Sequence, residues 1–181
     1  MKTFAQRAGW ILFGVIGMAA ASTAAAQCTA SGAPGSCSVP GSVSMTAVRV
    51  VRLQVNAGST SLTTPTPADF DAGFNSTTGP TLTVSANAPW TLQVRASAAT
   101  WTATNTSPGA PARAAKPAGD LKWSTNPAGA FSALSSTDVT LVSGVATASS
   151  ATTLYFQTLY NWTLDTPGNY SLTVVLTLTA P

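Results

Sequence analysis

The sequence predicts an all-β protein, a β-sandwich of about seven to nine short strands, and three observations support this prediction. Apolar and polar residues alternate in several runs, turns rich in Pro and Gly separate these runs, and helical periodicity is missing outside the first 26 residues. The longest alternation fills residues 164–181, where the side chains expected to face a core are Tyr170, Leu172, Val174, Leu176 and Leu178.

The turn before this last run refines the fold class. Asp165 and Thr166 precede Pro167, which fixes φ, and Gly168, which we expect to supply a positive φ. Tyr170 then opens the strand, as in the tyrosine corner of Greek-key sandwiches, where the phenol hydroxyl bonds upstream backbone. We therefore expect an Ig-like Greek-key β-sandwich with a tyrosine corner formed by Pro167, Gly168 and Tyr170.

Residues 1–26 have the pattern of a cleaved signal peptide. Lys2 and Arg7 precede an apolar run over residues 10–21, which is short for a membrane span, and Ala24 and Ala26 fit the small-residue cleavage rule. An uncleaved anchor is the alternative, although no stop-transfer pattern follows. We expect an exported protein at the cell surface, in the periplasm or outside the cell, without a membrane span after cleavage.

The two cysteines lie just after this segment. Cys28 and Cys37 bracket a turn-rich loop, and in an oxidising compartment a disulfide between them is expected. A metal site is the alternative, but no His and no further Cys could complete it. The prediction is a disulfide-tied N-terminal segment over residues 27–42 and a β-sandwich domain over residues 43–181.

Charge is scarce throughout the chain. Only 7% of the residues are charged, and cleavage after residue 26 would leave six basic residues (8 − 2) against five Asp. No basic patch is expected, so nucleic acid is not a predicted partner. Few charges also leave the edges of β-sheets poorly protected against pairing with other chains.

The remaining elements follow in chain order. Residues 43–55 are the first strand candidate, with a change of parity at Val50 that suggests a bulge or a switch between sheets. Short extended pieces are expected at 59–63 and 69–74, a hairpin at 81–86 and 89–96, a functional or mobile loop at 104–118, and strands at 120–124, 139–142 and 153–164.

Catalytic chemistry finds little support. Without His, the Ser/His/Asp and Cys/His constellations are impossible, and Asp69 and Asp71 are the only closely spaced carboxylates. A turn or solvated role for these two is favoured, and no motif supports a Ser/Lys dyad through Lys116 or Lys122. We predict a non-enzymatic protein without cofactor or metal; a hydrolase is a distant third reading.

Tryptophans raise the question of a ligand platform. Trp90 and Trp162 fall on the apolar faces of their expected strands, which predicts core positions. Trp101 and Trp123 flank the proline-rich loop and are the candidate platform, with anchoring in the core or the loop as the favoured alternative.

The ending GNYSLTVVLTLTAP (168–181), together with TPTPADFDAGFN (64–75) and TLTVSANAPWTLQV (81–94), resembles bacterial pilin-like and spore-coat-U-type secreted subunits. This resemblance implies a surface or structural subunit whose partners are other copies of itself or other pilus subunits, with strand-mediated assembly. Two W-x-L triplets, at Trp90 and at Trp162, resemble the motifs of WxL cell-wall-binding domains. That second resemblance implies the alternative, a module that binds cell-wall glycan or another polysaccharide.

The last strand also poses a pairing problem, since no strand candidate follows Thr179. Either residues 43–55 fold back beside it, or one edge stays open and takes a strand from another subunit. Residues 27–42 would be the donor, but their glycines and prolines favour the self-completed arrangement.

Overall fold

The computed structural model describes residues 27–105 and 112–181, so the predicted signal peptide lies outside the described residues. The chain divides into two compact units, residues 1–46 and 47–181, which are described separately. All strands of the described chain belong to the second unit: β1 (Val51–Val55), β2 (Phe74–Ala86), β3 (Trp90–Ala96), β4 (Thr102–Asn105), β5 (Leu121–Ser124), β6 (Ser132–Ala133), β7 (Val139–Gly144), β8 (Thr147–Leu159), β9 (Gly168–Ser171) and β10 (Val174–Thr179).

In the first unit the predicted disulfide between Cys28 and Cys37 is present. Residues 27–46 form no strand and their side chains are exposed. In the part of the chain that the structure describes, no helix has the length and apolar character needed to cross a membrane. A disulfide without such a helix is compatible with an exported protein.

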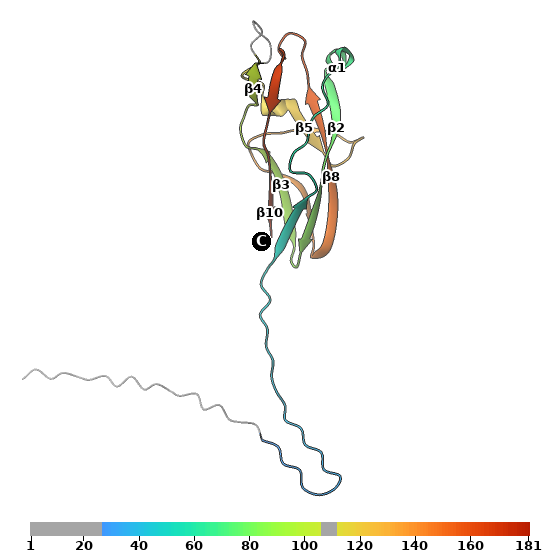
Figure 1. Ribbon diagram of the computed structural model, residues 1–181, viewed down its shortest axis with the longest axis vertical. Helices are drawn as coiled ribbons and strands as arrows, with labels where there is room; N and C mark the ends of the chain where they lie inside the picture. Colours follow the sequence, from blue (N-terminus) through green and yellow to red (C-terminus); the bar gives the residue numbers. More distant parts are fainter. Residues whose placement is uncertain (1–26, 106–111) are drawn as a thin grey trace, which may run out of the picture. The chain divides into compact units, whose positions relative to one another are not determined.

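The second unit is mostly β-structure, as predicted, and all its strand pairs are antiparallel (Figure 1). One sheet has five strands in the order β1-β2-β8-β5-β6, a second has three in the order β10-β3-β7, and β4 pairs with β9. This arrangement is compatible with the predicted β-sandwich.

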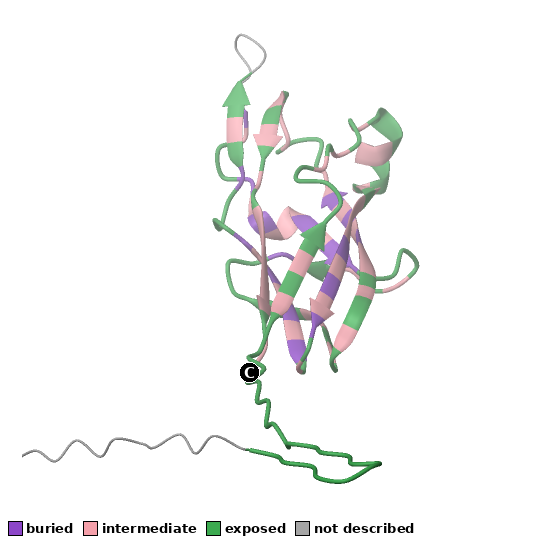
Figure 2. Cartoon of the chain, turned by 60° about the horizontal axis from the view of Figure 1, so that its bottom comes forward, coloured by how far each residue is buried: buried purple, intermediate pink, exposed green. Residues whose placement is uncertain are grey.

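One hydrophobic cluster joins the sheets. Its fully buried side chains come from β2, β3 and β8, and they are Leu82, Val84, Leu92, Val94 and Leu154. Along these three strands, buried residues alternate with partly exposed ones (Figure 2). The predicted core-facing residues of the last strand do pack against this cluster, and each remains partly exposed: Tyr170, Leu172, Val174, Leu176 and Leu178.

The predicted hairpin of residues 81–86 and 89–96 is wrong. Both segments are strands, but β2 pairs with β1 and β8, whereas β3 pairs with β10 and β7. Alternation identifies the inward face of a strand and leaves its hydrogen-bonding partner open. The Asn87 side chain secures the crossing between the sheets: its Oδ1 accepts the Val50 N–H at 2.8 Å, and its Nδ2 donates to the Val48 carbonyl at 2.8 Å.

The last alternating run is two strands rather than one. β9 pairs with β4 and β10 pairs with β3, because the opposing chain is itself interrupted between β3 and β4. At the break, Ser97 donates its N–H to the Thr173 carbonyl at 2.9 Å. The strand predicted over residues 153–164 also ends early, at Leu159, and turns follow it.

A short helix, α1 (Pro67–Ala72), replaces the extended piece predicted at residues 69–74. Its start is fixed by Asp69, whose carboxylate accepts the Thr66 N–H and hydroxyl, both at 2.7 Å. Gly73 ends it in the left-handed conformation, with φ of 79°. A helix of six residues is too short to produce a recognisable 3.6-residue pattern, so periodicity could not predict it.

The first strand is shorter than predicted. β1 begins at Val51 and its register with β2 runs without a shift, so the parity change at Val50 marks the start of the strand rather than a bulge. β1 pairs with β2 and not with the last strand. The favoured expectation, that residues 43–55 complete the edge beside the last strand, is therefore wrong.

Candidate functional site: an apolar groove between two strand edges

Several strands of the described chain end a sheet and so have one edge without a ladder partner, and two of these, β1 and β10, line the same groove. β1 is paired through β2 only, and β10 is paired through β3 only. Each edge therefore presents backbone N–H and C=O groups that another extended segment could use.

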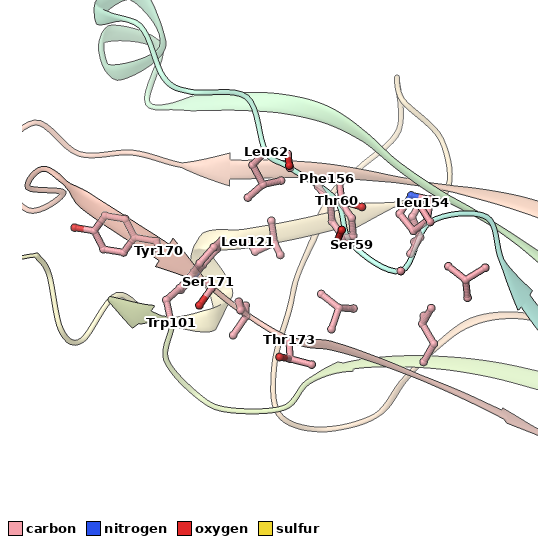
Figure 3. Close-up of a pocket in the computed structure, with 18 of the residues that line it drawn as sticks. Ser59, Thr60, Leu62, Trp101, Leu121, Leu154, Phe156, Tyr170, Ser171 and Thr173 are labelled. Atoms are coloured by element: carbon pink, nitrogen blue, oxygen red, sulfur yellow. The ribbon is translucent and has the colours of Figure 1, made fainter. Parts of the chain in front are cut away.

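A groove of about 790 Å³ opens beside these two edges. Leu53 and Val55 line it from β1, and Leu172, Val174 and Leu176 line it from the last part of the chain. Its floor is made of core side chains: Trp101, Leu121, Leu154 and Phe156. Figure 3 shows Leu121 between Leu62 and Thr60 on one side and Ser171 and Thr173 on the other.

The size of the groove matters because protein interiors are close-packed, with few voids larger than a water molecule. Here the groove opens over the core cluster, and the apolar residues along its sides, such as Leu53, Val174 and Leu176, remain partly exposed. An extended peptide laid along the free edge of β10 would pair with its backbone and direct alternate side chains into this opening.

The described chain contains an apolar segment that itself lacks a partner. Val39, Val43, Met45 and Ala47 share one parity, and Val43 and Met45 are 99% and 88% exposed. Gly41 falls at the same parity between them. The strand-like part of the N-terminal region is thus residues 39–47, largely C-terminal to the 27–42 segment that sequence reasoning selected as donor.

The tyrosine corner has the predicted hydrogen bond. The Tyr170 hydroxyl donates to the Thr166 carbonyl at 2.7 Å and accepts the Arg113 N–H at 3.0 Å. The expected positive φ at Gly168 is wrong, because in the described chain only Gly32 and Gly73 have one. Gly168 is needed for space: a Cβ there would lie 2.6 Å from the Cβ of Ala112.

Four charged side chains gather where the sequence shows only scattered charges. Lys116, 3% exposed, donates through Nζ to Asp165 at 2.9 Å, to Asp120 at 3.2 Å and to the Leu159 carbonyl at 2.8 Å. Arg113 donates to both carboxylates at 3.1 Å. Asp165, expected to belong to a turn, also pairs with the buried Lys116 and the partly buried Arg113, and Asp120 pairs with the same two cations. The sequence alone did not reveal this cluster, because Asp165 lies 49 positions after Lys116 in the chain.

Trp101 and Trp123, the candidate platform, are 5% and 8% exposed and belong to the core cluster. They cannot offer a ring face to a ligand at the surface, so that candidate is wrong and the alternative, anchoring in the core, holds. Trp90 is buried as predicted. Trp162, predicted to be core, is 59% exposed because β8 ends three residues before it.

Asp69 and Asp71 lie in α1 rather than on a strand face. The Thr66 hydrogen bonds hold the pKa of Asp69 below its ordinary value of 3.8, and Asp71 accepts the Trp162 Nε1–H at 3.0 Å. Burial raises the pKa of Tyr160, which lies near this helix. In residues 27–105 and 112–181, no three His, Cys, Asp or Glu side chains gather as metal ligands would.

Comparisons with protein-family models, with curated proteins and with solved structures give no match. We therefore infer the function from the groove, the two unpaired strand edges beside it and the surrounding side chains.

Proposed function

We propose that the protein is an exported, non-enzymatic surface or structural subunit that assembles by strand exchange: an extended segment of one copy fills the groove of the next. The observation that carries this proposal is the groove beside the unpaired edge of β10, lined by the partly exposed apolar side chains Leu172, Val174 and Leu176.

An Ig-like topology would explain why the groove lies there. In the seven-strand Ig arrangement, A, B, E and D form one sheet and C, F and G the other. Without the outer strands β6 and β7, the orders β1-β2-β8-β5 and β10-β3 match A-B-E-D and F-C. Tyr170 lies in β9, directly before the strand that would correspond to F. The position of strand G is then the free edge of β10, beside the groove.

The donor in this proposal is the segment 39–47 of another copy, which ends before Val48 and Val50, whose backbone is bonded to Asn87 of the same chain. Fully burying an apolar side chain of this size stabilises by about 1.5–3 kcal/mol, so Val43 and Met45 together would contribute about 3–6 kcal/mol before ordering costs. The ladder along β10 adds main-chain hydrogen bonds, which supply affinity in strand addition.

Size-exclusion chromatography with light scattering on residues 27–181 tests the proposal. We expect concentration-dependent multimers, and we expect the double variant Val43→Asp/Met45→Asp to be monomeric because two carboxylates cannot enter an apolar groove. The matched control is Val145→Asp, because Val145 is also largely exposed, at 75%, and lies in the turn between β7 and β8. It should assemble as the parent does.

A second variant separates groove filling from other modes of association. A second copy of residues 38–47 is appended after Pro181 through a flexible Gly/Ser linker, so that the segment can fill the groove of its own chain. This fusion should be monomeric and should unfold at a higher temperature than the parent. A fusion with the parent's mass and midpoint, or a double Asp variant that still assembles, would contradict strand exchange.

A further inference from the structure

An aromatic cleft lies at the end of the second unit where β8 stops. It has a volume of about 700 Å³ and is bordered by α1, by residues 62–65 and by the turn that leads into β9. Five aromatic residues line it: the buried Trp101, the partly buried Tyr170, and a group of three rings that meet at Phe70, namely Phe70, Tyr160 and Trp162. Pockets of this size commonly hold small ligands. We call this the aromatic cleft.

The rings are held in place before any ligand arrives. The Trp162 Nε1–H donates to Asp71 at 3.0 Å, and its ring lies on that of Phe70 with centroids 4.7 Å apart and planes at 30°. Tyr160 contacts Phe70 from another side at 5.4 Å. Trp162 is nevertheless 59% exposed, so a large apolar ring is fixed rigidly at the surface.

The loop carrying Trp162 is also fixed. The Asn161 Oδ1 accepts the N–H of Thr163 at 2.9 Å and that of Leu164 at 3.2 Å, and the Asn161 N–H donates to Asp165 at 2.8 Å. A side chain ordered this thoroughly loses little entropy on binding, which is the property of a preorganised platform.

The charges around the cleft select the kind of ligand. Among the described residues that line it, Lys116 is the only cation, and its three N–H donors are used by Asp120, Asp165 and the Leu159 carbonyl. An anionic ligand would therefore find no available positive charge. A cationic ligand is disfavoured at Tyr160, because the Lys116 ammonium already lies 5.6 Å from the centre of that ring.

What remains is a neutral ligand with a flat C–H face and several hydroxyls. The rest of the lining supplies hydrogen-bonding partners in Thr63, Thr64, Thr158 and Asn169. We propose that the aromatic cleft binds a neutral pyranose unit of a glycan, with its C–H face on the Trp162 ring and its hydroxyls toward these polar side chains. This site is separate in its residues from the donor segment, and the proposal does not depend on strand exchange.

The test is isothermal titration of residues 27–181 with four neutral hexasaccharides: cellohexaose, chitohexaose, maltohexaose and mannohexaose. We expect at least one to bind below about 10 mM, and Trp162→Ala to weaken that binding by about tenfold or more. Trp162→Phe keeps a ring and should retain part of the affinity. Because Trp162 is exposed, its fluorescence should shift on binding, and the shift should vanish in both variants.

The matched control is Leu164→Ala, an exposed apolar residue of the same loop that does not line the cleft. It should bind as the parent does. No binding by any of the four sugars, or unchanged binding by Trp162→Ala, would overturn the proposal. Preferential binding of choline or of oligogalacturonate would overturn it as well. The Val43→Asp/Met45→Asp variant should bind sugar normally, so failure of this proposal and failure of strand exchange are distinguishable.

Discussion

Replacing the buried Lys116 with Met offers a direct test of the charged cluster that supports the aromatic cleft. The substitution keeps a long apolar stem and removes the ammonium. Asp165, whose side chain is 6% exposed, would lose its partner at 2.9 Å, and the Leu159 carbonyl would lose its donor at 2.8 Å. Arg113 would still contact Asp165 and Asp120 at 3.1 Å.

Breaking a buried ion pair by removing one partner costs about 3–5 kcal/mol, and we expect about 3 kcal/mol here because Arg113 remains. For a chain of this size that corresponds to a fall in Tm of roughly 6–12 °C. Urea unfolding with an unchanged m-value measures it. Adding Asp165→Asn should recover part of the loss, since the uncompensated carboxylate is then gone.

Lys122→Met is the matched control, because Lys122 lies on β5, is only partly buried and belongs to no ion pair of this cluster. It should change the free energy of unfolding by no more than about 0.5 kcal/mol. If Lys116→Met leaves the midpoint unchanged or raises it, the cluster contributes nothing to stability and the reasoning fails.

Two further predictions concern single hydrogen-bonded groups. Tyr170→Phe should lower the free energy of unfolding by about 1–3 kcal/mol, because the Arg113 N–H loses its acceptor; an unchanged urea midpoint would show that Tyr170 is an ordinary packed ring. Asp69 has a pKa below 3.8, so its support of α1 is complete above that pH and is lost as the pH falls through the lowered value. Trp162 packs on this helix, so its fluorescence should change as the pH falls below about 4. The Asp69→Asn variant should show no such pH-dependent change.

Local interactions were predictable from the sequence. The hydrogen bond of the tyrosine corner joins Tyr170 to Thr166, four positions earlier. The turn residues that form the corner are adjacent in the sequence. Inward faces were predictable for the same reason, because the side-chain period of a strand depends only on the strand itself. Leu92 and Val94 are buried as the alternation required.

Pairing and end points were not predictable, because they depend on distant parts of the chain. The alternation in β2 and β3 is equally compatible with a hairpin and with a crossing between sheets. Whether Trp162 is buried or exposed depends on whether β8 continues for three more residues, and no local pattern predicts where the strand ends. The Lys116 cluster joins residues 49 positions apart, and each member alone resembles a solvated charge.

The scarcity of charge bears on how the open edge of β10 is protected. Monomeric sheet proteins commonly guard such edges with Lys, Pro, bulges or covering loops. β10 carries no charged residue and no Pro between Val174 and Thr179, and its register with β3 runs without a bulge. An unpaired edge beside an apolar groove is an aggregation hazard for a lone subunit, and the assembly proposed above would remove this hazard by covering the edge with residues 39–47 of a neighbour.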